Sequence, residues 1–410
     1  MNNKNEGDRS GEVELKIVAD YGTDRIDASV LNTSNYISTD NLLPERGGIT
    51  NSDYLPTKGK VSKFNIGDTL VSNIRPYFKK IWYAKETGGC SNDVIVFKPK
   101  TNKIDPKYLY YQLSKGDFFD FMMSGANGTK MPRGNKKSIP TFRLLLPSIP
   151  TQKRIASILS AYDDLIENNL KRIKLLEELA QRTYEEWFVK FTINGEQLPI
   201  DEKTGLPDGW ERKSLSAIGD ITSSKRIFLS EYVENGIPFY RSKEIIQKYN
   251  FENIDSPLFI TEKKYYEIKN KFGEPKQGDF LITAVGTLGY VHLVNEKDGE
   301  FYFKDGNLIW IKNIKNKLLI PMMFFRFRSS EFKNYLNSIA IGSSQKALTI
   351  ESMKRIELVI PTKEIQLSFD LIANPLLNQI YNIATQNQKL KESRDILLPK
   401  LMNGTLNIAS

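Results

Sequence analysis

The sequence predicts a mixed α/β protein built from two globular α+β domains that are joined by two long helices. Three observations predict this fold class. Motifs of the first half recur in the same order in the second half, which indicates an internal duplication. Short apolar runs bounded by Gly, Pro and Asn, which are typical of strands, occur in each half. Each half ends in about 40 residues with a helical apolar period.

Length and composition fit a protein of this kind. The chain has 410 residues, of which 40% are hydrophobic and 26% charged, and this length suits two or three domains. No apolar run reaches the roughly 18 residues of a membrane span, and the N-terminus lacks the apolar core of a secretory signal. The single cysteine, Cys90, excludes an internal disulfide. We therefore expect a cytoplasmic protein that makes no membrane contact.

The internal repeat rests on weak matches that share one order. The matched strings are NIGDTLVSNI (65–74) with KQGDFLITAV (276–285), DVIVFK (93–98) with NLIWIK (307–312), DPKYLYYQLSKGDFFDFMM (105–123) with IPMMFFRFRSSEFKNYL (320–336), and IPTQKRI (149–155) with IPTKEIQ (360–366). Pro106 and Pro321 mark predicted helix starts, where a proline loses no needed N–H. Matching residues of the two halves are 214 positions apart at Gly128 and Gly342 but 211 apart at the IPT strings. The loop that follows Gly128 is therefore predicted to be three residues longer than the loop that follows Gly342.

Heptad patterns predict two long helices, at 152–191 and 365–402, that pair as a coiled coil. In the first helix the seam positions are Leu159, Tyr162, Ile166, Asn169, Ile173, Leu176, Ala180, Thr183 and Trp187, with Phe188 adjoining. In the second they are Ile372, Leu376, Ile380, Ile383, Asn387 and Leu390. A buried Asn on such a seam sets the register of pairing. The dipeptide Asn374-Pro375 fits a kink or a fresh helix start.

Chain geometry favours antiparallel pairing of these helices. A compact domain of about 150 residues is roughly 40 Å across, whereas a 40-residue helix is about 60 Å long. The second domain connects the end of the first helix to the start of the second, and antiparallel pairing lets both ends of that domain lie together. We therefore predict one domain at each end of a two-helix rod, with a pseudo-twofold internal repeat. The predicted divisions are 1–148 and 196–359 for the domains, and 149–195 and 360–410 for the helices.

Basic residues concentrate in one loop of the first domain. The formal net charge is +9, and no acidic residue occurs from Phe121 to Tyr162. A solvated basic face is the common explanation of such a run. Here the run contains the Gly-rich loop SGANGTKMPRGNKKS (124–138) between apolar elements, which favours contact with DNA phosphates or bases. Two domains held a fixed distance apart would contact half-sites about one helical turn apart.

Several blocks resemble the specificity subunit of type I restriction–modification systems. These blocks are YISTDNLLPERGGI (36–49), GDTLVSNIRPYFKKIWYA (67–84), the first-helix segment 149–191, LPDGW (206–210), IPTKEIQLSFD (360–370) and LLPKLMNGTL (397–406). They follow the expected order over nearly the whole chain. The first domain departs from the pattern, because EVELKIVADYGTDRI (12–26) has no tryptophan where the second half has LPDGWERKSLSAIGDI (206–221).

The resemblance implies two target-recognition domains, each reading one half of a bipartite site in double-stranded DNA. It also implies that the helices set the gap and dock two methyltransferase (modification) subunits, which two DNA-translocating restriction subunits can join. On the same ground, S-adenosylmethionine, ATP and Mg are expected on the partner subunits, with no cofactor or metal on this chain.

Candidate DNA contacts follow from side-chain chemistry, since Arg or Lys suits guanine and Gln or Asn suits adenine. In the first domain the candidates are Lys130, Arg133, Lys136 and Lys137, and then Arg75, Tyr77, Lys79 and Lys80. In the second domain they are Ser344, Gln345 and Lys346, together with Arg241, Ser242 and Lys243. The sequence does not separate residues that read bases from residues that contact phosphates.

Signatures of catalysis are sparse. His292 is the only histidine and lies in the strand-like GYVHLVN, so a structural role is favoured, and Cys90 before a strand favours a buried thiol. No phosphate-binding glycine loop follows a strand, and NPLL at 374 suits a helix start better than a methyltransferase motif. We therefore expect a non-catalytic recognition subunit. A stand-alone bipartite DNA-binding regulator and an unrecognised nuclease or methyltransferase are the alternatives.

The aromatic cluster YEEWFVKF (184–191) at the end of the first helix leaves two roles open. Its side chains can fill the core of the second domain or form a docking surface for a methyltransferase subunit.

Overall fold

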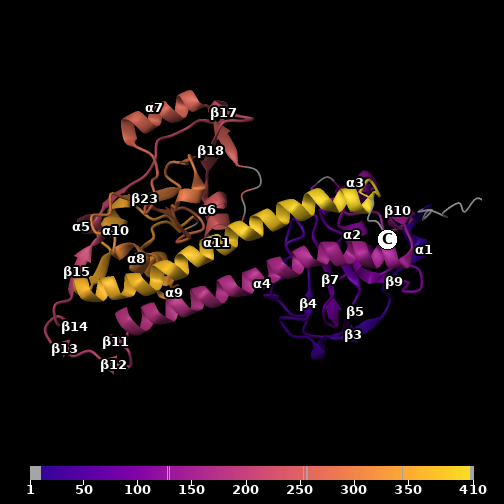
Figure 1. The fold of residues 1–410 in the computed structure, drawn as a ribbon, viewed down its shortest axis with the longest axis horizontal. Helices are drawn as coiled ribbons and strands as arrows, with labels where there is room; N and C mark the ends of the chain where they lie inside the picture. The colour runs from indigo at the N-terminus through magenta and orange to yellow at the C-terminus, as the bar shows by residue number, and fades with distance from the viewer. Residues whose placement is uncertain are drawn as a thin grey trace, which may run out of the picture. The chain divides into compact units, whose positions relative to one another are not determined.

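The computed structural model describes residues 11–126, 128, 130–252, 254, 257–343 and 345–406. They form two compact units (Figure 1). Unit 1 contains residues 11–166 and 389–406, and unit 2 contains the described residues of 167–388. Both boundaries fall within the long helices α4 (Ile149–Phe188) and α11 (Lys363–Met402), so each unit includes a part of both helices.

Each unit has a four-stranded antiparallel sheet of the same strand order. In unit 1 the order is β2 (Ala19–Tyr21), β9 (Val94–Pro99), β6 (Thr69–Ser72) and β7 (Ile81–Tyr83). In unit 2 it is β16 (Asp220–Thr222), β23 (Leu308–Lys312), β20 (Phe280–Thr283) and β21 (Val291–Leu293). We call this the frame sheet. Its recurrence confirms the duplication predicted from the sequence.

The turn that precedes β6 and β20 shows the repeat residue by residue. Gly67 and Gly278 have φ angles of +90° and +91°, a region that side chains with a Cβ avoid. The carboxylates of Asp68 and Asp279 each accept a backbone N–H from the residue three positions earlier, at 2.8 and 2.9 Å. The two Gly-Asp motifs therefore build the same turn in both units.

A two-stranded ribbon closes each unit. Strand β1 (Gly11–Glu14) pairs with β10 (Arg143–Leu146), and β15 (Glu211–Ser214) pairs with β24 (Glu357–Ile360). After these strands the N–H groups of Leu15 and Leu215 donate to Phe142 O and Ile356 O, both at 2.8 Å. The first domain therefore begins in the same register as the second, although it lacks the equivalent of Trp210 within this stretch.

The structure corrects the predicted alignment at the start of the long helices. Strand β10 ends at Leu146 and β24 ends at Ile360, and each long helix begins three residues later. The side chains of Gln152 and Gln366 are buried at the matching helix positions, and each donates to the carbonyl of the residue five earlier, at 2.8 and 2.7 Å. The first IPT string thus lies inside α4, whereas the second spans the end of β24.

The predicted three-residue extension of the first loop is accordingly wrong. Ile74 forms an isolated antiparallel bridge with Arg133, and Val285 forms the equivalent bridge with Ala347. Arg133 and Ala347 are 214 residues apart, and so are the starts of α4 and α11. A proline is tolerated in the first turn of a helix, so the string IPT can occur both at the start of α4 and at the end of β24. Matching the two strings therefore gave an alignment that is shifted by three residues.

A second four-stranded sheet in each unit differs in strand order. Unit 1 has β3 (Arg25–Asp27), β5 (Lys60–Phe64), β8 (Gly88–Cys90) and β4 (Tyr36–Ile37); unit 2 has β17 (Tyr232–Val233), β19 (Leu258–Ile260), β18 (Ile237–Tyr240) and β22 (Tyr302–Phe303). One parallel pair occurs in each, β4 with β8 and β18 with β22. Strand β5 pairs with β8, whereas β19 pairs with β18. A common frame sheet thus carries a variable second sheet.

The remaining elements cover these sheets and connect them. The short helices are α1 (Leu15–Val18), α2 (Pro106–Leu113), α3 (Gly116–Ser124), α5 (Leu215–Ile218), α6 (Ser242–Tyr249), α7 (Glu262–Phe272), α8 (Leu319–Arg328), α9 (Ser330–Ile339) and α10 (Ile350–Lys354). The 3₁₀ turns are Ala28–Val30, Pro76–Phe78, Ile139–Thr141, Leu229–Glu231 and Glu296–Asp298, and two hairpins pair β11 (Thr192–Ile193) with β12 (Glu196–Gln197) and β13 (Ile200–Asp201) with β14 (Leu206–Pro207). Pro106 opens α2 as predicted, whereas Pro321 is the third residue of α8.

Within each unit α4 and α11 run antiparallel, as predicted. In unit 1, Leu159 of α4 shares a buried core with Leu398 and Leu401 of α11. In unit 2, Ile173 packs against Ile380 and Ile383. Asn169 also contacts Asn387 in unit 2, so within that unit residue numbers rise along α4 as those of the partners fall along α11. Figure 1 shows both helices as continuous ribbons, so of the two possibilities at Asn374-Pro375, a kink or a fresh helix start, the fresh start is wrong.

The predicted Asn pair lies on this seam in unit 2. Asn169 Nδ2 donates to Asn387 Oδ1 at 2.9 Å, and both side chains are buried. Ile166 is also buried, whereas Leu176 and Leu390 are half-buried. Because a misaligned seam would leave each amide against an apolar side chain, the pair favours a single register.

Candidate nucleic-acid interface

Unit 1 brings two predicted DNA-contact segments together beyond the end of β6. The Arg75 N–H donates to Pro132 O at 2.8 Å, and the Gly134 N–H donates to Asn73 O at 3.1 Å. With the bridge between Ile74 and Arg133, these bonds join the segment 75–80 to the basic loop 130–137. The two segments are separate candidates in the sequence, and the fold makes them neighbours.

Unit 2 repeats this junction beyond the end of β20. The Gly286 N–H donates to Lys346 O at 3.0 Å, so Gly286 stands where unit 1 has Arg75. Both have positive φ angles, +74° and +49°. The side-chain amide of Gln345 lies over Gly286, because a Cβ there would be 3.5 Å from Gln345 Nε2. Ser344 lies outside the described residues.

The four basic candidates of the loop are all exposed, although two of them also contact the protein. Arg133 lies 3.2 Å from a carboxylate oxygen of Asp93, and Lys136 Nζ donates to Asn92 O at 3.4 Å. Lys130 and Lys137 project from the same loop. This cluster presents positive charge where the loop meets the end of the frame sheet.

Of the candidates in the segment 75–80, Tyr77 is exposed, whereas Arg75, Lys79 and Lys80 are half-buried. Tyr77 is exposed, and its ring centroid lies 4.6 Å from that of Phe78. Lys79 lies 3.6 Å from Glu45 Oε2. Lys80 donates to Thr39 O at 2.5 Å, and burial lowers the pKa of its ammonium group. Lys80 therefore has a structural contact, whereas Tyr77 offers an aromatic surface to a ligand.

In unit 2 the candidates of segment 241–243 lie at the start of α6. Arg241 binds the buried carboxylate of Glu244 through Nε and Nη2, at 3.2 and 2.7 Å. This contact raises the pKa of Arg241, against the opposing effect of its burial. Ser242 is half-buried and Lys243 is exposed. Arg241 thus neutralises Glu244, while Lys243 and the exposed Gln345 and Lys346 remain surface groups.

Trp187 and Phe188 take the first of the two roles that the sequence left open. Both are buried in the core of unit 2, where Phe369 of α11 packs against them at centroid distances of 5.9 and 4.8 Å. Phe188 also lies 5.8 Å from the ring of Trp210, the residue of the LPDGW motif. Core packing therefore explains this cluster.

A polar network that the sequence pattern does not indicate lies beside the seam in unit 1. Arg394 of α11 lies 2.6 Å from Oδ1 of Asp163 on α4, and Tyr111 Oη donates to Oδ2 of the same carboxylate at 2.6 Å. Asp395 lies 3.0 Å from Arg394. Arg394 and Asp163 lie off the heptad seam, and only the fold shows that Arg394 is buried.

His292 and Cys90, the one histidine and the one cysteine of the sequence, are both buried. His292 Nε2 lies 2.8 Å from Oδ2 of Asp298, and Lys248 lies 2.9 Å from Oδ1. Burial raises the pKa of the Cys90 thiol to about 12. Among the described residues, no three His, Cys, Asp or Glu side chains are grouped so that they could hold a metal ion. None of the helices in that part of the chain is long and apolar enough to cross a membrane.

A duplicated frame sheet, with an exposed basic loop at its end in unit 1, is the arrangement expected of a protein with two DNA-binding domains. The sequence profile described as the type I restriction modification DNA specificity domain matches residues 20–178 and 207–392. The chain belongs to this family, and its role is DNA sequence specificity. The resemblance noted in the sequence is thereby confirmed.

Individual relatives agree with this assignment. The chain is 28% identical over 309 residues to the type I restriction enzyme MjaIX specificity subunit of Methanocaldococcus jannaschii, which covers 74% of this chain and 69% of that one. It is 22% identical over 432 residues to the type I restriction enzyme HindI specificity subunit of Haemophilus influenzae, covering 87% and 90%.

A solved structure shares the fold. The crystal structure of the S subunit of a type I restriction–modification system from M. genitalium aligns with a TM-score of 0.58 at 17% identity, over 99% of this chain and 98% of that one. It therefore supports the two-domain architecture with long helices.

Proposed function

We propose that this chain is the specificity subunit of a type I restriction–modification complex and that each unit reads one half of a bipartite, gapped DNA site. The observation that carries the proposal is the duplication of one DNA-specificity domain within a single chain. Two copies with the same frame sheet and different surface residues suit two half-sites of different sequence. A single domain would need only one contiguous site.

In this proposal α4 and α11 hold the gap between the half-sites. Each helix has 40 residues, and the seam contacts occur in both units. A continuous helix is a stiff connector, since its length changes only by adding or removing residues at about 1.5 Å each. The gap would therefore be a fixed number of base pairs.

A matched duplication of one heptad tests this role. Residues 167–173 of α4 and 383–389 of α11 are duplicated together, which keeps the seam in phase. Seven residues add about 10 Å, or roughly three base pairs at 3.4 Å each. We expect the methylated motif to keep both half-sites and to gain roughly three unspecified positions. Duplication in one helix alone is the control, and it should abolish activity; an unchanged gap in the double duplication would contradict the proposal.

We further propose that the long helices dock two methyltransferase subunits, which hold S-adenosylmethionine, and that this chain itself performs no chemistry. Leu175 and Leu179 of α4 and Leu371 of α11 support this proposal, because they remain 63%, 54% and 76% exposed on helix faces away from the seam. Exposed leucines grouped on a helix commonly mark a protein interface. ATP and Mg would belong to restriction subunits that join the same complex.

Copurification tests the docking surface. Leu175→Glu with Leu179→Glu should abolish copurification of the methyltransferase subunit without lowering the melting temperature of the chain, because neither side chain is in the core. Lys174→Glu is a matched control on the same turn and should leave the complex intact. A complex that survives the double substitution would show that the partner binds elsewhere.

A further inference from the structure

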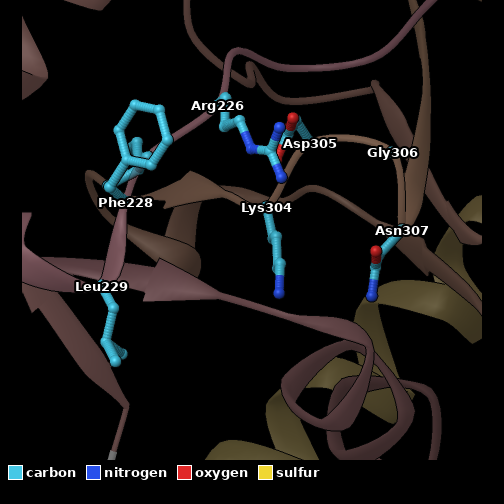
Figure 2. Close-up of a pocket in the computed structure, with 8 residues that line it drawn as sticks. Arg226, Phe228, Leu229, Lys304, Asp305, Gly306 and Asn307 are labelled. Carbon is cyan, nitrogen blue, oxygen red and sulfur yellow. The ribbon is translucent and has the colours of Figure 1, made fainter.

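Each unit has a polar pocket that borders the same strand pair of the frame sheet. In unit 1 the pocket has a volume of about 420 Å³ and lies where the chain leaves β2 and enters β9. In unit 2 a pocket of about 490 Å³ lies where the chain has left β16 and enters β23 (Figure 2). Because β2 pairs with β9 as β16 pairs with β23, the two pockets are equivalent in the repeat. Lys136 in the unit 1 pocket is one of the DNA contacts predicted from the sequence. The other residues that line the two pockets were not among those predicted contacts.

The unit 1 pocket combines an arginine with an amide and a second cation. Arg25 Nη1 lies 3.4 Å from Asn92 Oδ1 and 3.5 Å from Ser62 Oγ. Lys136 of the basic loop donates to Asn92 O, and its own carbonyl accepts from Tyr21 Oη at 2.9 Å. The pocket therefore joins the loop predicted to contact DNA to the end of the frame sheet. Arg25, Asn92 and Lys136 are all exposed at its mouth.

The unit 2 pocket repeats the arginine and the amide with different neighbours. It is lined by Arg226, Lys304, Asp305 and Asn307, with Phe228 at its edge. Figure 2 shows that the side chains of Lys304 and Asn307 extend in the same direction. The guanidinium of Arg226 lies 5.6 Å from the centre of the Phe228 ring, which is 60% exposed.

We propose that these two pockets are base-reading sites, and that Arg25 and Arg226 are specificity-determining contacts to one half-site each. The proposal rests on the proposed function and names where that function is carried out. Arginine presents two parallel donors that match guanine O6 and N7, and asparagine matches adenine N6 and N7. Both pockets offer both side-chain types at the end of a strand pair that the duplication holds in place.

The chemistry of the unit 2 pocket favours a base edge over a phosphate. A carboxylate repels a phosphate but accepts a hydrogen bond from cytosine N4, and Asp305 lines this pocket beside two cations. Phe228 and Leu229 are exposed at its edge, by 60% and 83%, and suit apolar contact with a thymine methyl or a base face. A site built only to hold a phosphate would need none of these groups.

The two pockets also differ in the side chains that surround the arginine, as expected of two sites that recognise different bases. Unit 1 supplies Tyr21, Ser62 and Lys136 beside Arg25, whereas unit 2 supplies Phe228, Lys304 and Asp305 beside Arg226. We therefore expect the two half-sites to have different sequences.

Sequencing of N6-methyladenine tests the proposal in cells that carry the full chain with its modification partners. Arg226→Ala should relax one or more positions within one half-site, with at least about fivefold lower discrimination, and leave the other half unchanged. Arg25→Ala should do the reverse, so each variant controls for the other. Arg226→Lys keeps the charge but not the paired donors, and it should relax the same positions. Arg212→Ala, an exposed arginine on β15 of unit 2, is the matched control and should leave the motif intact.

Three results would overturn the proposal in distinguishable ways. A split motif that survives Arg25→Ala and Arg226→Ala unchanged would overturn the base-reading assignment alone. Uniformly weaker methylation with an unrelaxed motif, restored by Arg226→Lys, would identify a phosphate contact instead. No split motif with the unsubstituted chain would overturn the proposed function, and the base-reading sites with it. Melting temperatures equal to that of the unsubstituted chain establish that each variant is folded.

Discussion

Arg394 provides the most stringent test of how α11 is held to unit 1. Its side chain is only 10% exposed and lies between Asp163 and Asp395. Burial lowers the pKa of its guanidinium, but Asp163 and Asp395 more than offset this effect, so the pKa is raised. Tyr111 also donates to Asp163, which links α2, α4 and α11 in one network.

The expected magnitudes follow from burial. Arg394→Met removes the cation and leaves Asp163 facing an apolar side chain. Loss of one partner of a fully buried pair costs about 3–5 kcal/mol. The Asp163 side chain is 28% exposed, however, and water stabilises part of its charge. We therefore expect a loss of about 2–3 kcal/mol.

The double variant separates the interaction between the two charges from the effect of each substitution on packing. Arg394→Met with Asp163→Leu removes both charges and leaves Tyr111 without its acceptor, at a cost of about 1 kcal/mol. Asp163→Leu alone should cost about 2 kcal/mol, because Asp395 still accompanies Arg394. The double variant should therefore be more stable than either single variant, with a coupling of about 3 kcal/mol.

Urea unfolding, followed together with hydrogen exchange in α2 and the end of α11, measures these differences for unit 1. Lys153→Met, at an exposed position of α4 within unit 1, is the control and should change stability by less than about 0.5 kcal/mol. Additive losses in the double variant would refute the coupled network, since additivity would mean that the two charges do not interact.

Three further predictions concern local chemistry. Gly67→Ala should destabilise unit 1 by about 1–2 kcal/mol in urea unfolding, because its φ of +90° strains any side chain; an unchanged midpoint would mean that the turn adopts another conformation. The Cys90 thiol, whose pKa burial raises to about 12, should resist a thiol reagent at pH 8 and react fully in denaturant, and rapid labelling of the folded chain would contradict its burial. Burial raises the pKa of Asp298, but His292 and then Lys248 more than offset it, so the pKa lies below its usual value. A depressed carboxylate pKa stabilises the folded state above pH 4, and this contribution is lost as the pH falls further. Asp298→Asn should therefore cost about 3 kcal/mol at pH 7 and less at pH 3, and an equal loss at both would contradict the ion pair.

The elements that sequence patterns located well are those with long periods or strict backbone demands. The seam from Leu159 to Ile173 repeats often enough to specify both a helix and its partner face. The turn at Gly67 requires a positive φ angle that glycine meets best, so its recurrence at Gly278 marked equivalent structure. In both cases local physics restricts the sequence.

Other features depended on the fold. The two IPT strings are identical in sequence but do not occupy equivalent positions. The buried amides of Gln152 and Gln366 show which positions of the two long helices correspond. A single glutamine in a sequence does not indicate burial. Arg25 and Arg226 were missed because no shared motif marks them: Arg25 is the first residue of β3, whereas Arg226 lies outside the helices and strands. Each follows the aspartate of a matched strand by five or six residues, and only the pairing of those strands makes the two arginines equivalent.

The central claim is that one chain specifies a split DNA site, and sequencing of N6-methyladenine in host DNA tests it most directly. The gene for this chain is compared intact and deleted in the same background. We predict that deletion abolishes methylation at one motif, composed of two short and different half-sites around a fixed unspecified gap. An unchanged methylation pattern, with the modification subunits present, would contradict the account and favour a DNA-binding regulator that works alone.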